Sequence, residues 1–343
     1  MAEINTASAG ADKAGGPGSA PVTLTLAIVG AGTGSPSVAH YADRVNAISS
    51  GNVRIRVVSE WGAFAADAEE QVIRATAAGK VDLGWTGTRA FDSLGVRSFQ
   101  ALSAPMLIDS NELVTAILGG PIPGRMLPVL EQVDVAGLAV FGDGIRLPVA
   151  VRQPLRAPSD WRGLSIGTLR STVQQQAITA LGATPLAVFG PFRVHALDNG
   201  QIQGYEFDAQ LYATQDSAVR APFVTTNIPL WPQTDVLFAN PGSLASLSAA
   251  QRAWLAQAAA ETVRASVDLT RPSRDELFRA CSLGARFIEA SPADITAMRA
   301  AFETVYASLN SDPETQAFID DIVRLKSRVA AGDLFALPPG CAR

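Results

Sequence analysis

The residues best suited to contact a ligand begin with a glycine-rich turn. Gly30-Ala-Gly-Thr-Gly34 follows a β-branched and leucine-rich stretch, Val22–Val29, which predicts a strand. Ser35 and Pro36 come next, and these residue types favour the N-cap and the first position of a helix. A helix N terminus offers free backbone N–H groups that bind anions or other polar groups. We therefore expect this turn to face a binding cleft.

A dinucleotide-binding site is an alternative interpretation of the same turn. That fingerprint has a third glycine in register and an acid that follows the second strand. Ser35 stands at the third glycine position, although Glu60 does lie just past the second predicted strand. The imperfect motif favours general polar binding over a nicotinamide-dependent dehydrogenase, and we expect no cofactor.

Aromatic side chains gather at predicted strand ends and in the loops that follow them. Ligands of open α/β sheets bind outside the carboxyl ends of the strands, which favours a binding role for these rings. Burial in the core is the competing interpretation for each one. Their place at strand ends favours a binding role most for Trp61, Trp85, Tyr205 and Tyr212. The full aromatic set is Trp61, Phe64, Trp85, Phe91, Tyr205, Phe207, Tyr212 and Trp231.

Residues that could support catalysis or hold a metal are scarce. The histidines are His40, near the predicted cleft, and His195, expected at the surface or satisfied by a neighbour; no Gly-x-Ser-x-Gly motif occurs. Two cysteines, Cys281 and Cys341, are too few for a zinc site. They are either both reduced or joined in one bridge, and the sequence leaves both possibilities open. We expect no metal and no enzymatic activity.

Length and charge narrow the class of protein further. A chain of 343 residues favours two domains. The net charge is −5, and lysine and arginine do not cluster, so we expect no nucleic-acid partner. The sequence has neither an apolar run of roughly 18 residues nor a signal-peptide pattern. Residues 1–21, rich in Ala, Gly and Ser, predict a flexible tether, left either by removal of an export leader or by an artificial addition.

The order of predicted elements indicates an α/β protein with two lobes. Strands and helices alternate over residues 22–85 and again over 146–205, which is typical of parallel sheets with helical crossovers. From Ser248 to about Ala331 the chain is mostly helical and is interrupted by prolines. The predicted boundaries are 22–145 plus 233–270 for the first lobe, and 146–232 plus 271–335 for the second lobe with the C-terminal helices.

A series of segments in the middle of the chain carries a family resemblance. In this order and spacing they resemble the solute-binding subunits of tripartite ATP-independent periplasmic (TRAP) transporters, of the dicarboxylate-binding type. Shorter similarities at 69–84, 104–106, 238–240 and 247–251 extend the resemblance over most of the chain. The main segments are Gly142-Asp-Gly-Ile-Arg146, Pro158-Ser-Asp-Trp-Arg-Gly-Leu-Ser-Ile166, Ala180-Leu-Gly-Ala-Thr-Pro185, Val194-His-Ala-Leu-Asp-Asn-Gly200 and Gly204-Tyr-Glu206.

The resemblance implies a monomer with two lobes, crossed by a long helix, that close over a small solute. The protein would act in the periplasm or on the outer face of the cytoplasmic membrane, with a lipid anchor as one option, and deliver its solute to membrane permease subunits. The binding subunit of an ATP-driven importer is the alternative, since it shares the architecture. Such a subunit should lack the Ser159–Gly163 and Gly200–Glu206 landmarks.

The resemblance also implies roles for arginines. In the family, an arginine that ends the Gly-Leu-x-Ile strand pairs with the ligand carboxylate, and a second arginine precedes it. Arg146 matches the second arginine, whereas Gly167 stands at the first position. We expect Arg146 to hold a carboxylate, Arg170 to reach the same space, and Gly167 to leave room for an organic acid or a larger aromatic or polar solute. The predicted ligand-binding residues are Trp61, Trp85, Thr88, Arg146, Gly167, Arg170, Tyr205, Glu206, Phe207, Tyr212 and Trp231.

Overall fold

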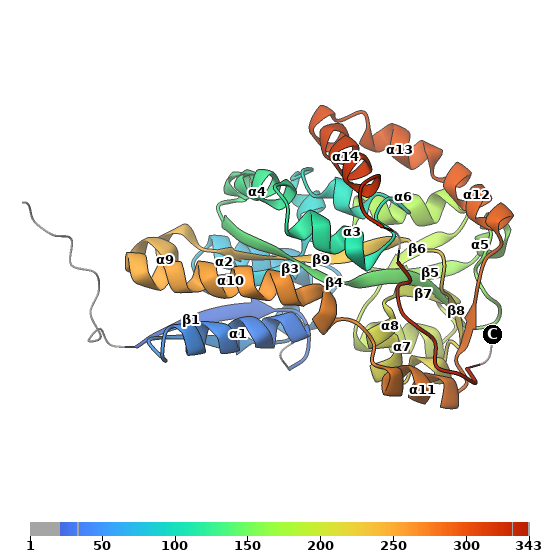
Figure 1. The fold of residues 1–343 in the computed structure, drawn as a ribbon, viewed down its shortest axis with the longest axis horizontal. Coiled ribbons are helices and arrows are strands. Elements are labelled where there is room, and N and C mark those ends of the chain that lie inside the picture. Colours follow the sequence, from blue (N-terminus) through green and yellow to red (C-terminus); the bar gives the residue numbers. More distant parts are fainter. Residues whose placement is uncertain (1–20, 33, 331, 342–343) are drawn as a thin grey trace, which may run out of the picture.

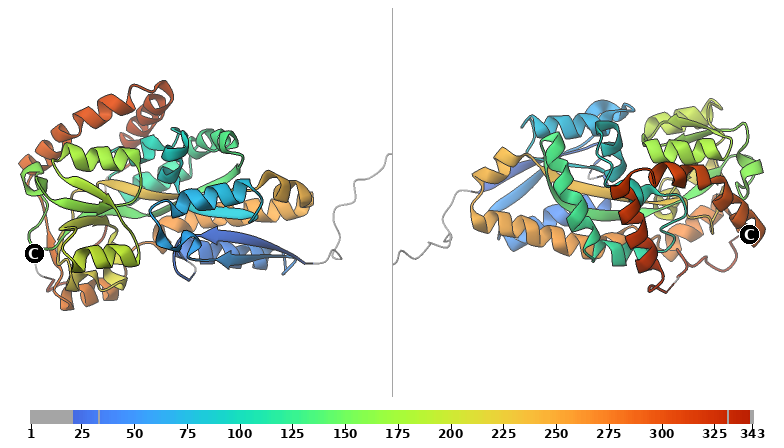
Figure 2. Two further views of the ribbon diagram at one scale, coloured as in Figure 1. Left: turned by 180° about the vertical axis from the view of Figure 1, so that it is seen from behind. Right: turned by 90° about the horizontal axis from the view of Figure 1, so that it is seen from above.

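The computed structural model describes residues 21–32, 34–330 and 332–341, so the predicted tether lies outside the described residues except for Pro21. The described chain forms a 10-stranded sheet with helices around it (Figure 1). Two half-sheets share the long strand β4 (Ala136–Ala150), which pairs with β9 (Trp231–Ala239) in the first half. The view from behind and the view from above in Figure 2 show the two halves next to each other.

The first half-sheet carries the N-terminal strands. Its order is β2 (Val53–Val58), β1 (Val22–Ile28), β3 (Leu83–Gly87), β9 and the first part of β4. β1 pairs in parallel with β2 and β3, as the alternation of strands and helices predicted, whereas β9 runs antiparallel to β3 and β4. Strands covered by helices on both faces bury nearly every residue, and β3 and β9 are buried throughout.

Helices cover both faces of the first half-sheet. α1 (Pro36–Ile48) and α10 (Ala249–Leu269) pack together on one face, against Leu24 and Leu26 of β1, and α2 (Ala68–Ala77) packs on the other. Ser35 caps α1 by accepting a hydrogen bond from the backbone N–H of Ser37, as its residue type predicted. The cap fixes the start of α1 at the end of β1, beside the junction of the two half-sheets.

The second half-sheet continues from the second part of β4. Its order is β4, β7 (Gly204–Phe207), β5 (Ser165–Thr168) and β6 (Thr184–Ala187). β5 is parallel to β6 and β7, and β7 is antiparallel to β4. A short pair, β8 (Phe223–Thr225) and β10 (Arg286–Ile288), joins this half through β4.

A bulge in β4 marks the junction of the two halves. The register with β9 shifts between Gly142 and Ile145, so Asp143 and Gly144 stand out of the ladder. Gly144 has a φ of 85°, and a Cβ there would lie 2.7 Å from Cβ of Asp208, so only glycine is accommodated. The bulge turns Asp143 toward the space between the half-sheets.

The C-terminal part is helical, as predicted, and contacts both halves. α10 and the segment after it lead from the first half to α11 (Arg274–Ser282), which packs against α8 (Ala209–Thr214) in the second half. α13 (Glu303–Leu309) packs against α6 (Thr172–Ala180), and α14 (Pro313–Lys326) packs against α3 (Asn111–Leu118) of the first half. The chain then returns along the surface, and Cys341 forms a disulfide with Cys281 of α11, which resolves the open question on the cysteines.

The remaining short elements connect the strands and surround the sheet. In the described part of the chain, no single helix is long and apolar enough to cross a membrane. One bent pair of helical segments, 111–118 with 122–133, has the length and composition of a membrane span, but its apolar side chains belong to the core. These elements are η1 (Trp61–Phe64), η2 (Thr88–Leu94), η3 (Gln100–Ser103), α3 (Asn111–Leu118), α4 (Ile122–Met126), η4 (Leu127–Val133), α5 (Pro158–Trp161), α6 (Thr172–Ala180), α7 (Pro191–Asp198), α8 (Ala209–Thr214), η5 (Ser217–Val219), α9 (Pro241–Ser246), α11 (Arg274–Ser282), α12 (Pro292–Ala301), α13 (Glu303–Leu309) and α14 (Pro313–Lys326).

Candidate ligand-binding site

A cavity of about 540 Å³ lies where the two half-sheets meet. The carboxyl ends of β1, β3, β5 and β7 reach it, as the general rule for open α/β sheets predicts. Gly30, Ala31, Gly34 and Ser35 line one wall, so the glycine-rich turn does face the cleft. A Cβ on Gly30 would lie 2.8 Å from Cα of Gly34, which explains the glycines by close packing of the turn. The volume suits a small organic molecule.

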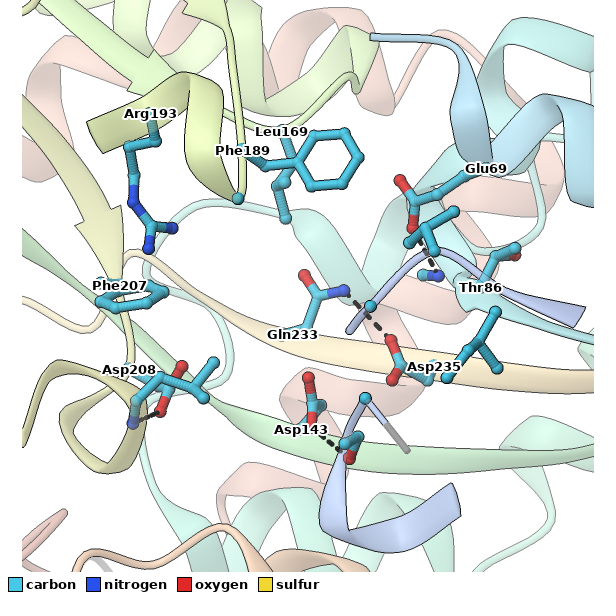
Figure 3. A pocket seen from close by; sticks show the side chains of 18 of the residues that line it. Glu69, Thr86, Asp143, Leu169, Phe189, Arg193, Phe207, Asp208, Gln233 and Asp235 are labelled. Atoms are coloured by element: carbon cyan, nitrogen blue, oxygen red, sulfur yellow. Dashed lines mark hydrogen bonds between the residues drawn. The ribbon is translucent and has the colours of Figure 1, made fainter. Parts of the chain in front are cut away.

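Two carboxylates, Asp143 of β4 and Asp235 of the neighbouring strand β9, face the cavity (Figure 3). Asp143 Oδ1 accepts a hydrogen bond of 2.7 Å from Ser35 Oγ, at the start of α1. Asp235 Oδ2 accepts one of 3.0 Å from Trp85 Nε1, and its Oδ1 accepts one of 3.1 Å from Gln233 Nε2. All these donors are neutral. Burial raises the pKa of both carboxyl groups, and the charge of Asp235 raises that of Asp143 further.

Arg146 is buried beside two other carboxylates. Its Nη1 lies 3.1 Å from Asp208 Oδ2, and its Nε lies 3.6 Å from Glu206 Oε2. Burial opposes the charge of Arg146, but Glu206 and Asp208 outweigh this effect and raise the pKa of the guanidinium. Burial also raises the pKa of Glu206 and Asp208, against the attraction of Arg146. The positive charge of Arg146 is therefore already engaged within the protein.

A second internal ion pair forms another part of the wall. Arg89 Nη1 lies 2.5 Å from Glu69 Oε2, and Arg89 Nη2 lies 3.0 Å from Glu69 Oε1, a two-point pairing. Glu69 Oε1 also accepts a hydrogen bond of 2.9 Å from the backbone N–H of Gly87. Both side chains are buried, and their charges balance, so this pair shapes the cavity without adding net charge.

Arg193 is the guanidinium most available to a ligand. It comes from the first turn of α7 and stacks over Phe207, with its Cζ 3.9 Å from the ring centroid. Its Nη2 donates a hydrogen bond of 2.9 Å to Gln215 Oε1, a neutral acceptor. Within the described chain, no carboxylate lies within the 4.0 Å of an ion pair. Burial lowers the pKa of Arg193, as expected for a cation without a close counter-ion.

The structure brings five of the predicted binding residues to the cavity and places six elsewhere. Arg146, Gly167, Trp85, Glu206 and Phe207 line the cavity. Those outside the lining are Trp61, Thr88, Arg170, Tyr205, Tyr212 and Trp231.

Local packing explains why the six residues lie elsewhere. Arg170 lies outside the lining because its guanidinium pairs with another residue: its Nη1 lies 3.1 Å from Glu70 Oε1, and its side chain is 46% exposed. Tyr212 is buried and donates a hydrogen bond of 3.0 Å to the carbonyl of Ala221. Tyr205 and Trp231 are also core residues, as the competing interpretation allowed.

The two remaining residues pack beside the cavity. Thr88 Oγ1 lies 2.7 Å from Thr234 Oγ1, so the two hydroxyl groups satisfy each other. Trp61 packs against the apolar core. His40 does not line the cavity either; its Nδ1 lies 2.9 Å from Thr262 Oγ1 of α10, while His195 is exposed, as expected.

The space around Gly167 differs from the prediction. A Cβ on this residue would lie 2.8 Å from Ile202 Cδ1 and 3.3 Å from Cβ of Tyr205. These side chains belong to the core of the second half. The missing side chain therefore does not enlarge the cavity, because apolar neighbours fill its place, and only the backbone of Gly167 reaches the lining.

Sequence reasoning missed Asp143, Asp235 and Arg193. Asp143 stood inside a family segment, between Gly142 and Gly144, and an acid between two glycines in a strand is a signal for a bulge. Asp235 and Arg193 carry no comparable local signal. The pairing of β9 with β4 directs Asp235 to the cavity, and stacking on Phe207 directs Arg193 there.

The fold and cavity define a ligand-binding protein with two α/β lobes. Residues 34–312 match the model of the family described as bacterial extracellular solute-binding protein, family 7, and the chain belongs to this family. A C4-dicarboxylate-binding periplasmic protein of Rhodobacter capsulatus is 26% identical over 138 residues, which cover 40% of this chain and 41% of that protein. The chain spans about half or less of the length of the curated relatives it matches first.

Solved structures share the whole fold. A sugar-acid-binding protein of Advenella mimigardefordensis in complex with galactonate is 20% identical with a TM-score of 0.79, covering 91% of this chain and 99% of that one. A TRAP periplasmic solute-binding protein of Shewanella oneidensis with bound succinate is 18% identical with a TM-score of 0.79, covering 89% and 99%. The predicted two-lobed α/β fold and the family resemblance are thereby confirmed.

Proposed function

We propose that this protein captures a small organic solute by closure of its two lobes and delivers it to the membrane subunits of a TRAP transporter. The observation that carries the proposal is the cavity at the junction of the half-sheets, lined by buried charged groups from both. A solute that contacts both lobes binds the closed form better than the open form, which is the physical requirement for ligand-driven closure. Family membership supports a site of action outside the cytoplasm.

Contacts between elements support the predicted lobe division, with one difference. α10 packs on β4 and α1, in agreement with its place in 233–270, and α11 packs on α8, in agreement with 271–335. α14 packs on α3 and η3, which both lie in the predicted first lobe, so in our proposal the last helix belongs with the first lobe rather than the second.

Arg193 is the group that we expect to hold an acid group of the solute. It replaces, in our proposal, both Arg146, whose charge is engaged by Asp208, and the arginine absent at Gly167. The relatives with bound galactonate and succinate support an acid-bearing solute. A lipid anchor and a monomeric state stay predictions.

Binding without turnover tests the proposal. A ligand that binds only the folded state adds about 2.7 kcal/mol to the free energy of unfolding at a hundredfold excess over Kd. We expect one or more compounds of a broad organic-acid library, including amino acids and sugar acids, to raise the melting temperature and to be recovered unchanged by mass spectrometry. A library without a single stabilising compound, or a compound that is chemically converted, would contradict solute capture.

A further inference from the structure

The charges around the cavity are unbalanced toward acid. Six carboxylates line it against three guanidinium groups, and neither lysine nor histidine is found among the described lining residues. Glu60 is exposed at the rim, where water screens its charge. The other five carboxylates are Glu69, Asp143, Glu206, Asp208 and Asp235, and the guanidinium groups are Arg89, Arg146 and Arg193.

Internal pairs account for most of these charges and leave three. Glu69 is balanced by Arg89, and Glu206 and Asp208 share Arg146. Asp143, Asp235 and Arg193 remain. Across the part of the chain that the structure describes, no arginine or lysine nitrogen lies within the 4.0 Å of an ion pair to Asp143 or Asp235. When ionised, these three groups carry one positive and two negative charges, and the sharing of Arg146 by two carboxylates leaves one further negative charge.

These groups are arranged on opposite sides of the cavity. Figure 3 shows Arg193 and Phe189 on one side, and Asp143 and Asp235 together on the other. Asp235 pairs with Phe141 in the ladder of β4 and β9, two residues before Asp143, so the strands hold the two carboxylates near each other. Burial and mutual repulsion favour the protonated form of these carboxyl groups in the empty site, whereas a cation placed between them would favour the ionised form of both.

A polar atom near the acidic side also lacks a hydrogen-bond partner. Thr86 lines the cavity and is only 2% exposed, and its Oγ1 has no hydrogen-bond partner within the described structure. Buried polar atoms normally have partners, so this hydroxyl points to a polar group supplied from the cavity. An ammonium or guanidinium group offers several N–H donors, whereas a carboxylate offers none.

We propose that the solute carries a positively charged nitrogen, held between Asp143 and Asp235, in addition to the acid group held by Arg193. The inference rests on the proposed function and narrows its substrate class to zwitterionic solutes such as amino acids and their derivatives. A metal ion is the competing occupant, but no group of three metal-ligating side chains is found in the described structure. The apolar side chains of Leu169 and Phe189 suit the carbon skeleton of an organic cation.

The solute itself provides the first test. The purified protein is incubated with a total small-molecule cell extract, washed and denatured, and the released compounds are identified by mass spectrometry. We expect the enriched compound to contain a basic nitrogen and a carboxylate. An enriched acid without a basic nitrogen overturns the inference while the proposed function stands. Recovery of no compound at all contradicts solute capture itself, and the inference fails with it.

Matched ligands and variants provide the second test. The enriched compound is compared by calorimetry with its analogue in which the amine is replaced by hydrogen. We expect wild type to prefer the amine by roughly 10- to 100-fold, the range of charge-assisted hydrogen bonds. In Asp143→Asn and Asp235→Asn this preference should fall below about threefold, whereas Glu131→Gln, an exposed acid on η4, should keep it.

Two results of this experiment would overturn the inference. An unchanged preference in both folded variants, verified by circular dichroism, would show that neither carboxylate contacts the amine. Stabilisation of wild type by Ca²⁺ alone, lost in both variants, would show that the pair binds a metal ion instead.

Discussion

Arg193 and Arg146 both line the cavity, yet the structure assigns them different roles that substitution can separate. Arg193 contacts one neutral acceptor, Gln215, and the ring of Phe207, so Arg193→Gln should cost the unliganded protein only about 1 kcal/mol, the strength of a cation–π contact. Loss of a charge-assisted bond to the solute should cost about 1.5–3 kcal/mol of binding free energy, or roughly 10- to 150-fold in Kd.

Arg146→Gln should give the opposite result. It leaves Asp208 and Glu206 buried without their counter-ion, and breaking such a pair costs about 3–5 kcal/mol of stability. The assay combines thermal unfolding of the unliganded proteins with calorimetry of the solute. Arg220→Gln is the control, because its guanidinium forms an exposed pair with Asp198 of the same helix as Arg193. Equal affinity of Arg193→Gln and wild type, or an unliganded Arg146→Gln as stable as wild type, would refute this assignment.

Three further predictions concern stability. Burial raises the pKa of Asp92 to about 7, so the contribution of this carboxyl group to the free energy of unfolding is fully present below about pH 4 and is lost as the pH rises through 7. In urea unfolding at a series of pH values, Asp92→Asn should be as stable as wild type near pH 4 and more stable by up to about 4 kcal/mol at pH 8, and equal curves would contradict this. Cys281 and Cys341 are 60 residues apart, so replacing both with serine should cost up to about 4 kcal/mol, and thiol titration of the unreduced protein should find neither free; two titratable thiols would disprove the bridge. Gly167→Ala should lower stability by about 1–3 kcal/mol through overlap with Ile202, whereas a neutral effect would indicate that this space is open.

Local patterns predicted the elements of the fold because each depends on near neighbours in the sequence. Ser35 and Pro36 start α1 as predicted, and the alternation of strands and helices gave the parallel pairing of β1 with β2 and β3. The antiparallel insertion of β9 between β3 and β4 was not predicted, because it pairs residues that lie far apart in the sequence, from Arg146 with Trp231 to Leu83 with Ala239.

The site was predicted less well, since facing the cavity depends on packing between distant segments. Tyr205 and Phe207 are aromatic residues two positions apart on the same strand and both pack in the core of the second lobe, yet only Phe207 also lines the cavity. Arg146 was assigned to the ligand by position in a motif, but Asp208, 62 residues later, engages its charge. Pairing between side chains cannot be inferred from the identity of either one.

The positions of the unpaired charges connect the proposed solute to lobe closure. Arg193 belongs to α7 of the second half, whereas Asp143 is hydrogen-bonded to Ser35 at the start of α1 in the first half. A solute with both charges contacts the two halves at once through these groups, so its binding energy depends on the distance between the lobes. Binding energy of this kind shifts the equilibrium toward the closed form. The same arrangement that selects a zwitterion would therefore also make its binding the signal for closure.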